Sequence, residues 1–304
     1  MPLRVIFLGT SASVPTKNRG QVSVALQRGG ELLLFDAGEG VQRSIITAKL
    51  GFRKKMSVFI SHIHGDHCLG LLGLLQSMDM MQRDALLSIY GPPGLEKFLK
   101  SNFESLKSNP TFPVEIHEIE EEGVISMGDG YDVFSCFSEH STPTLSYMLQ
   151  EHDRPGVFYP KKASQLRVPE GRLWSNLQRG KVVEVDGRKV LPDHVMGAKR
   201  KGRKIGISGD TRPTEKLRKF FQDCDLLMFD STFTDDLTSK AIETFHSTSR
   251  EAAKLARKAA VKKLILTHIS ARYNDTETLF QQAREEHQNV QVATDFLIVD
   301  VPYR

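Results

Sequence analysis

A run of three histidines and one aspartate constrains this chain more than any other feature. The residues Ser61-His62-Ile63-His64-Gly65-Asp66-His67 follow directly after the apolar stretch Ser57–Ile60. Histidine is the commonest metal-binding side chain, and carboxylates suit the same cations. So many polar groups at the end of a buried strand would need other partners if no metal were bound. The run therefore favours a metal site over a solvated, histidine-rich turn.

Short apolar stretches alternate with helix-like stretches along most of the chain. Strands are expected at Val5–Leu8, Leu32–Phe35, Ser57–Ser61, Leu87–Tyr90, Val114–Ile119, Tyr131–Phe137, Ile205–Ser208, Leu226–Phe229, Leu264–Thr267 and Phe296–Val301. Helices are expected over Asp66–Met81, Gly94–Ser105, Ser249–Ala260 and Thr276–His287. This mixture predicts an α/β fold, with layers around one core in a single domain over residues 1–304.

Membrane and disulfide-rich classes are disfavoured by the sequence. No apolar run approaches the ~20 residues of a transmembrane helix, and Met1–Gly9 is too short and strand-like for a signal peptide. The three cysteines, Cys68, Cys136 and Cys224, are scattered and odd in number, which favours free thiols over a disulfide framework. A cytoplasmic protein with no membrane partner is therefore expected.

Residues 152–204 interrupt the alternation of strands and helices. Proline and glycine recur throughout this segment, so it is expected to be irregular and to form an inserted arm within the single domain. Between Glu151 and Lys204 there are fourteen Lys and Arg residues against six Asp and Glu residues, a net charge of +8 in a chain whose total is +4. This concentration of charge favours contact with a polyanion over a merely solubilising loop.

Further metal-binding side chains follow other predicted strands. His140 lies in Ser138-Glu139-His140-Ser141, Asp210 in Ser208-Gly209-Asp210-Thr211 and His268 in Thr267-His268-Ile269-Ser270. One such residue alone is usually a satisfied polar group or a helix cap. Because α/β proteins place their sites where strands end at one edge of a sheet, three of them favour one shared site with the histidine run.

This ordered set, together with Asp36 in Phe35-Asp36-Ala37-Gly38-Glu39, resembles the metallo-β-lactamase superfamily. The resemblance implies a four-layer αβ/βα sandwich and two zinc ions, although manganese or iron would also fit these ligand types. It implies that His62, His64 and His140 hold one ion. It also implies that Asp66, His67 and His268 hold the other, with Asp210 bridging and Asp36 orienting the ligands by hydrogen bonds.

Other motifs resemble the ribonuclease Z family of tRNA 3′-processing endonucleases. They are Val5–Thr10 with Val14–Arg19, Gly70–Leu75, Leu266–Tyr273, and Phe229–Phe233 with Phe245–Thr248. Three positions depart from the family pattern. Gly20 follows Arg19 where the family has Asn, in a loop associated with rejecting tRNA that already ends in CCA. Asp230 replaces a Glu, and Gly171-Arg172 replaces a Gly-Pro pair.

The resemblance implies removal of the 3′ trailer from precursor tRNA, which leaves a 3′-hydroxyl on the tRNA and a 5′-phosphate on the trailer. Asp66 is expected to act as general base. His246 is expected to assist the leaving 3′-oxygen, with Asp230 holding its tautomer. His246 precedes the capping-box pattern Thr248-Ser249-Arg250-Glu251, so the alternative is that it only caps the following helix.

The arm is expected to bind RNA, and the family resemblance implies a homodimer. The candidate RNA-binding residues are Lys161, Lys162, Arg172, Arg179, Lys181, Lys199, Arg200 and Lys201. Other activities would suit the same ligands: a small-molecule phosphodiesterase, a lactone or thioester hydrolase, or a 3′-exonuclease. A non-catalytic RNA-binding protein is disfavoured because structural zinc sites are usually closed and rich in cysteine.

Overall fold

The computed structural model describes residues 1–303, which form two units. The first, called the body, comprises Met1–Gln150 and Lys204–Pro302. The second, called the arm, comprises Glu151–Arg203 and Tyr303. Within the described part of the chain, every helix is too short or too polar to cross a membrane.

Two seven-stranded sheets form the centre of the body. The first has the order β18 (Ile298–Asp300), β1 (Leu3–Gly9), β3 (Ser23–Arg28), β4 (Glu31–Phe35), β5 (Lys55–Phe59), β6 (Leu87–Gly91) and β7 (Val114–Glu118). The second has the order β17 (Val290–Val292), β15 (Leu264–Thr267), β14 (Leu226–Asp230), β13 (Lys204–Ile207), β10 (Thr144–Glu151), β9 (Tyr131–Ser138) and β8 (Gly123–Gly128). A short parallel pair joins β2 (Ser11–Ala12) to β16 (Ile269–Ser270).

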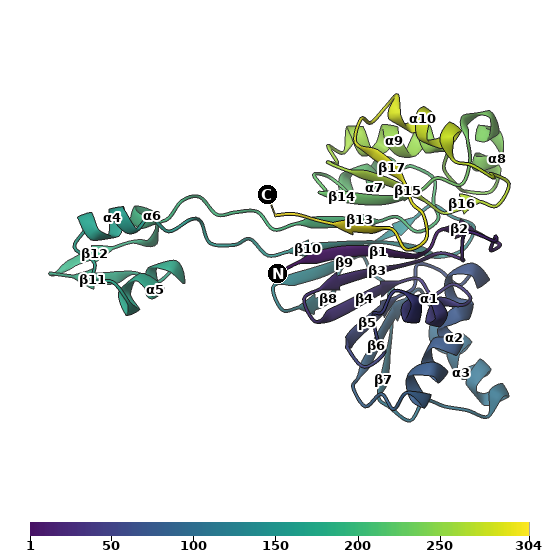
Figure 1. Ribbon diagram of the computed structural model, residues 1–304, viewed down its shortest axis with the longest axis horizontal. Coiled ribbons are helices and arrows are strands. Elements are labelled where there is room, and N and C mark those ends of the chain that lie inside the picture. Colours follow the sequence, from purple (N-terminus) through teal and green to yellow (C-terminus); the bar gives the residue numbers. More distant parts are fainter. Residues whose placement is uncertain (304) are drawn as a thin grey trace. The chain divides into compact units, whose positions relative to one another are not determined.

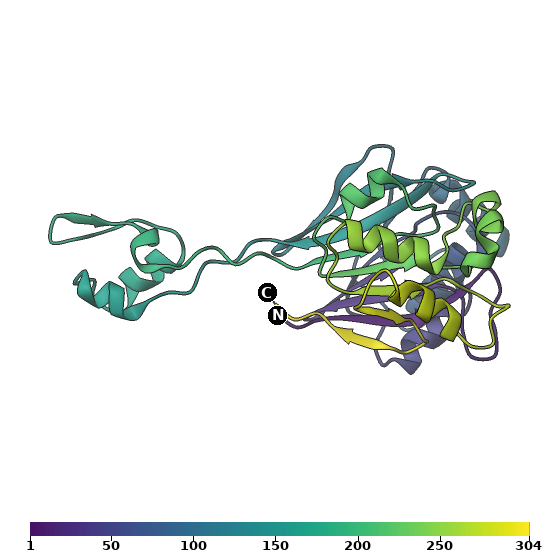
Figure 2. The same cartoon turned by 90° about the horizontal axis from the view of Figure 1, so that it is seen from above.

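Helices cover the outer face of each sheet (Figures 1 and 2). They are α1 (Val41–Thr47), α2 (Gly65–Met80) and α3 (Leu95–Leu106) on the first sheet, and α7 (Glu215–Phe220), α9 (Ser249–Lys258) and α10 (Glu277–Arg284) on the second. One apolar core separates the two sheets, and a further core lies under each helical layer. A short helical turn, η1 (Asp235–Leu237), and α8 (Thr238–Glu243) precede α9. The body is therefore the predicted four-layer αβ/βα sandwich.

Parallel strands bring the ends of distant segments to one edge. Strands β4 to β7 are parallel neighbours in the first sheet, as are β13, β14, β15 and β17 in the second. All five residues of β14 are buried, as a parallel strand between two layers requires. The candidate residues that follow or end these strands are Asp36 after β4, His62 after β5, Asp210 after β13, Asp230 in β14 and His268 after β15.

The predicted strands and helices of the body are confirmed, with ends that agree within three residues. The strands and α-helices of the body that were not predicted are β2, β3, β8, β10, β16, β17, α1, α7 and α8. Strands β3 and β10, for instance, carry polar residues that weaken their apolar signal, and these find partners only in the folded chain. Ser146 of β10, for example, donates to the carbonyl of Ser208 at 2.6 Å.

The arm has regular structure of its own, which corrects the expectation of an irregular segment. Its elements are α4 (Pro160–Gln165), α5 (Arg172–Gln178), β11 (Val183–Val185), β12 (Arg188–Val190) and α6 (Pro192–Val195). Proline and glycine here separate short elements and do not abolish them. A small core of Ala163, Val168, Leu177, Val183, Val190 and Val195 holds these elements together.

Candidate active site

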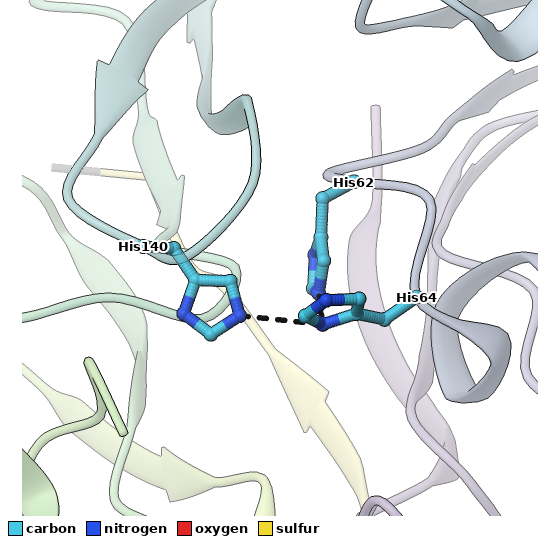
Figure 3. A group of neighbouring side chains, drawn as sticks. All are labelled: His62, His64 and His140. Carbon is cyan, nitrogen blue, oxygen red and sulfur yellow. Dashed lines mark hydrogen bonds between the residues drawn. The ribbon is translucent and has the colours of Figure 1, made fainter. Parts of the chain in front are cut away.

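Three histidine rings from two sheets meet at the edge of the body. His62 Nε2 lies 2.9 Å from His64 Nδ1, and His140 Nε2 lies 3.3 Å from the same atom. Figure 3 shows the three rings turned toward one another. The other ring nitrogen of His140 lies 3.2 Å from the carbonyl of Phe245, to which it donates as Nδ1–H. Three imidazole nitrogens that converge on one point form a set of ligands for a single cation.

A second group centres on a carboxylate oxygen of Asp210. Its Oδ2 lies 3.2 Å from His67 Nε2, 3.3 Å from His268 Nε2 and 3.7 Å from His62 Nε2. Asp66 Oδ2 lies 3.4 Å from His268 Nε2 and 3.6 Å from His67 Nε2. Asp210 thus lies between the three-histidine group and the group formed by Asp66, His67 and His268, which is where a bridging ligand is expected.

The hydrogen bonding of these groups fits a metal site. His67 Nε2 and Asp210 Oδ1 are fully buried and make no acceptable hydrogen bond within residues 1–303. Buried polar atoms normally have a partner, so such an exception needs an explanation. Nitrogen and carboxylate donors suit zinc, manganese and iron alike. A divalent metal bound by these residues would satisfy both atoms.

The acidities of several ligands agree with this assignment. His67 is the exception, because burial lowers its pKa but the charges of Asp210 and Asp36 outweigh burial and raise it well above the ordinary value, so a metal would have to displace its proton. Burial lowers the pKa of His62 well below its ordinary value and also lowers that of His140, so both imidazoles are neutral, the form that binds metal. Burial opposes ionisation of Asp66, but the contact with His268 and the charge of His67 outweigh it and lower the pKa. Burial also opposes ionisation of Asp210, but the charges of His268 and His67 hold its pKa well below the ordinary value. Both carboxylates are therefore available as ionised ligands.

Asp36 holds two residues of the histidine run, Ser61 and His67, by hydrogen bonds. Its carboxylate accepts hydrogen bonds from the Ser61 amide at 2.7 Å, the Ser61 hydroxyl at 2.9 Å and His67 Nδ1–H at 2.8 Å. The backbone of Asp36 has φ 57°, a left-handed conformation that Asp tolerates better than most residues. Because Asp36 binds the Nδ1–H of His67, it fixes the orientation of the ring and leaves Nε2 facing the other ligands.

Helix α2 carries Asp66 and His67 in its first turn. Gly70 on this helix lets the helix approach the turn after Asp36, because a Cβ there would lie 1.9 Å from the carbonyl oxygen of Gly38. The amide of Ser13, from the loop after β2, donates to Asp66 Oδ2 at 2.7 Å. The carboxylate of Asp66 is therefore held from two sides of the site.

His246 lies beside both ligand groups. Its ring centroid is 5.2 Å from those of His140 and His268. Its Nδ1–H donates to Asp230 Oδ2 at 2.9 Å. Burial opposes protonation of His246, but the charge and hydrogen bond of Asp230 outweigh it and raise the pKa to about 9. The cap of helix α9 is the side chain of Thr248 and not His246, which removes the alternative that His246 serves only as a cap.

Four residues of the site were not singled out from the sequence: Ser61, Thr211, Arg212 and Thr232. Arg212 pairs with Glu251 and donates to the carbonyl of His246. The Thr211 amide donates to Asp230 at 3.1 Å. Ser61 and Thr232 stand inside motifs already recognised, but their roles depend on contacts that residue spacing does not reveal.

The candidate RNA-binding residues all lie in the arm and are exposed: Lys161, Lys162, Arg172, Arg179, Lys181, Lys199, Arg200 and Lys201. Lys162 rests over the ring of Tyr159, 4.8 Å from its centroid. The small core beneath them orders the backbone that carries these charges.

Comparisons with known proteins agree with this geometry. Residues 193–269 match the β-lactamase superfamily domain, and residues 3–148 match the anti-Pycsar protein Apyc1 family. The chain is 45% identical to ribonuclease Z of Nitrosopumilus maritimus over 98% of its length and 100% of that protein. It is 46% identical to ribonuclease Z of Methanosarcina acetivorans over 99% of both chains.

Solved structures show the same architecture. The structure of human tRNase Z, short form, matches with a TM-score of 0.73 and 26% identity over 98% of this chain and 99% of that one. The metallo-β-lactamase fold protein YhfI from Bacillus subtilis matches with a TM-score of 0.70 and 17% identity over 99% of this chain and 100% of that one. The second likeness concerns the fold alone.

Proposed function

Because the chain belongs to the ribonuclease Z family, a family of metal-dependent endoribonucleases that process tRNA 3′ ends, we propose that its site uses two zinc ions to cut precursor tRNA. The cut would fall between the tRNA and its 3′ trailer, leaving a 3′-hydroxyl on the tRNA. The observation that carries the proposal is full-length similarity to ribonuclease Z proteins combined with two adjacent groups of ligands.

In this proposal His62, His64 and His140 hold one ion, while Asp66, His67 and His268 hold the other and Asp210 bridges them. When bound, the two ions would neutralise phosphoryl charge and lower the pKa of an attacking water. The approach of Asp210 Oδ2 to histidines of both groups supports the shared role. Manganese or iron would be accepted by the same nitrogen and oxygen ligands.

Two side chains of the body would move protons. Asp66 projects an ionised oxygen between His67 and His268, where it accepts the proton of the attacking water. His246 is held by Asp230 through Nδ1, so its other nitrogen is left to protonate the departing 3′-oxygen. Asp36 acts one contact further away by fixing the ring of His67.

The decisive assay for the function uses a tRNA precursor that bears a 3′ trailer. The purified protein should release one discrete trailer fragment carrying a 5′-phosphate, and a chelator should abolish the cut. A ladder of products would indicate a 3′-exonuclease, and hydrolysis of small phosphodiesters alone would indicate a small-molecule phosphodiesterase. Either outcome would replace the proposed activity.

We assign tRNA binding to the arm on the strength of its charge. Eight exposed cations on an ordered scaffold supply salt-sensitive affinity for phosphate that is largely indifferent to sequence. Deleting residues 155–198 should weaken precursor cleavage far more than hydrolysis of a small phosphodiester. A finer test compares Lys199→Ala/Lys201→Ala with the charge-matched control Lys97→Ala/Lys100→Ala on α3. Equal effects of the two double variants on precursor cleavage would refute the role of the arm.

We further propose a cytoplasmic homodimer. The dimer follows from the family resemblance, and light scattering of the eluted protein would measure it directly; a monomer mass would exclude it. The cytoplasm is supported by Cys68, Cys136 and Cys224, which are all buried free thiols. Fractionation of the source cells tests the location.

A further inference from the structure

Two buried hydroxyl groups occupy equivalent positions beneath the ligand groups. Ser61 Oγ lies 2.9 Å from Asp36 Oδ2 and 3.0 Å from His62 Nδ1. Thr232 Oγ1 lies 2.6 Å from Asp230 Oδ1 and 2.9 Å from His268 Nδ1. Each hydroxyl thus stands between a carboxylate and the Nδ1 atom of a candidate metal ligand. Ser61 and Thr232 are only 2% and 4% exposed, so water does not compete strongly for these contacts.

Each carboxylate is a pure acceptor. Asp230 accepts the amides of Thr232 at 3.0 Å and Thr211 at 3.1 Å, in addition to His246 Nδ1–H. Asp36 accepts the amide of Ser61 and His67 Nδ1–H. An ionised carboxylate can only accept, and a hydroxyl has a single hydrogen to donate. The hydroxyl hydrogens of Ser61 and Thr232 therefore point to the carboxylates.

The direction of these hydrogens decides the tautomers of two histidines. Once its hydrogen is donated, a hydroxyl oxygen offers only lone pairs to its second neighbour. His62 and His268 must then present Nδ1–H to the hydroxyls, and their Nε2 atoms carry the lone pairs. Those Nε2 atoms are the ones that face Asp210 Oδ2, at 3.7 Å and 3.3 Å. Lone pairs facing a carboxylate at this distance are stabilised by a cation between them.

We propose that Ser61 and Thr232 are positioning residues. Each hydroxyl donates to a carboxylate and accepts the Nδ1–H of one histidine, which leaves the Nε2 of that histidine as the metal-binding nitrogen. Thr232 has a second task, because its oxygen also lies 3.3 Å from His246 Nδ1. One hydroxyl therefore joins a metal ligand to the histidine proposed as proton donor. The inference rests on the proposed metal ligands but does not depend on tRNA as the substrate.

The test replaces Thr232 by Val, which keeps the shape of the side chain and removes the oxygen. Partners that orient metal ligands typically contribute about 10–100-fold to metal affinity. Zinc affinity, measured by competition with a chromophoric chelator, should therefore fall by about 10–100-fold for one of the two ions. Thr232→Ser, which restores the hydroxyl, should bind zinc within a few-fold of the parent protein.

Thr267→Val is the matched control, because Thr267 is also a buried threonine at a strand end of the same sheet. Its hydroxyl has no hydrogen-bond partner within residues 1–303. Removing that oxygen should leave zinc affinity unchanged. An equal loss in Thr267→Val would show a general packing effect and overturn the inference.

The tautomers themselves give a readout that activity does not. In metal-free protein carrying ¹⁵N-histidine, the nitrogen shifts of His268 should report Nδ1–H in the parent and in Thr232→Ser, and a mixture of tautomers in Thr232→Val. If Thr232→Val does not fold, Ser61→Ala provides the same two readouts for His62. Unchanged affinity and unchanged shifts overturn the inference, whereas a parent protein that binds no metal overturns the proposed function instead.

Discussion

His246 offers the sharpest test of the proposed chemistry. Its proposed role, protonation of the departing oxygen, matters only for a leaving group that needs a proton. The imidazole is held by Asp230 at 2.9 Å and lies outside the two groups of three ligands that are proposed to hold the ions. It is also close enough to Asp210, Asp230 and His268 to form a further possible set of ligands, so bound metal is measured in the same experiment. Replacing it with Ala should remove proton donation and leave metal content intact. General acid catalysis typically contributes about 10²–10⁴-fold, which corresponds to ~2.7–5.5 kcal/mol of barrier.

The structural cost of His246→Ala is small enough for the variant to be studied. Asp230 keeps its bonds from the Thr232 amide, the Thr232 hydroxyl and the Thr211 amide. The losses are one charge-assisted hydrogen bond to Asp230, worth about 1.5–3 kcal/mol, and the 3.3 Å contact with Thr232 Oγ1. The side chain of His246 is 12% exposed, so water can enter the space it vacates.

The assay compares two substrates under single-turnover conditions. The ribose 3′-oxygen of precursor tRNA is a poor leaving group, so its release should slow by about 10²–10⁴-fold in the variant. The nitrophenolate of bis(p-nitrophenyl) phosphate departs without a proton, so its release should slow by less than ~10-fold. His117→Ala, an exposed histidine on β7, is the control and should change neither rate. Equal losses on both substrates, or loss of bound zinc, would refute the assignment.

Three further outcomes are expected. Gly70→Ala should destabilise the protein by about 1–3 kcal/mol or more, since its Cβ would press on the backbone oxygen of Gly38. Gly73→Ala on the same helix meets only a flexible glutamine side chain and should be neutral or stabilising by up to ~1 kcal/mol; similar denaturant midpoints for the two would contradict this. Thr248→Ala should cost about 1 kcal/mol through loss of the α9 cap and should also slow precursor cleavage, while Thr214→Ala, which removes the α7 cap, should cost as much and leave cleavage unchanged. Chelation should lower the melting temperature, because a ligand at about 100 times its Kd adds ~2.7 kcal/mol to the folded state; an unchanged melting temperature would argue against a tightly held metal.

The fold and most of the site were predictable because both depend on local signals. Apolar strands that end in His or Asp are visible in residue order, and parallel strands bring such ends to one edge. Strand β10 was missed because Ser146 and Glu151 break its apolar pattern, and their partners lie in other segments. The arm was expected to lack structure because its apolar residues are few, and their mutual packing appears only in three dimensions.

The contacts that orient the ligands were not predictable from the sequence, and the reason is a different one. Thr232 meets His268 across 36 residues, and the hydrogen bond exists only when β14 and β15 pair in register. The same holds for Asp36, whose bond to His67 spans 31 residues. Residue type and spacing therefore identify which atoms can bind a metal, whereas strand register decides which of their nitrogens face it.

Two residues of the site have strained, left-handed backbone conformations. Asp36 and His268 both have positive φ, at 57° and 58°, although neither is glycine. A left-handed residue costs roughly 1–2 kcal/mol, so the pair opposes folding by a few kcal/mol. Glycine would remove that cost at either position, but it would also remove the three hydrogen bonds of Asp36 or the imidazole of His268. Positive φ alone does not mark the site, because ten other non-glycine residues within 1–303 share it, among them Lys49 and Lys107. Asp36 and His268 differ from most of these because their side chains touch or belong to the ligand groups, so at these two positions the cost is tied to holding the site.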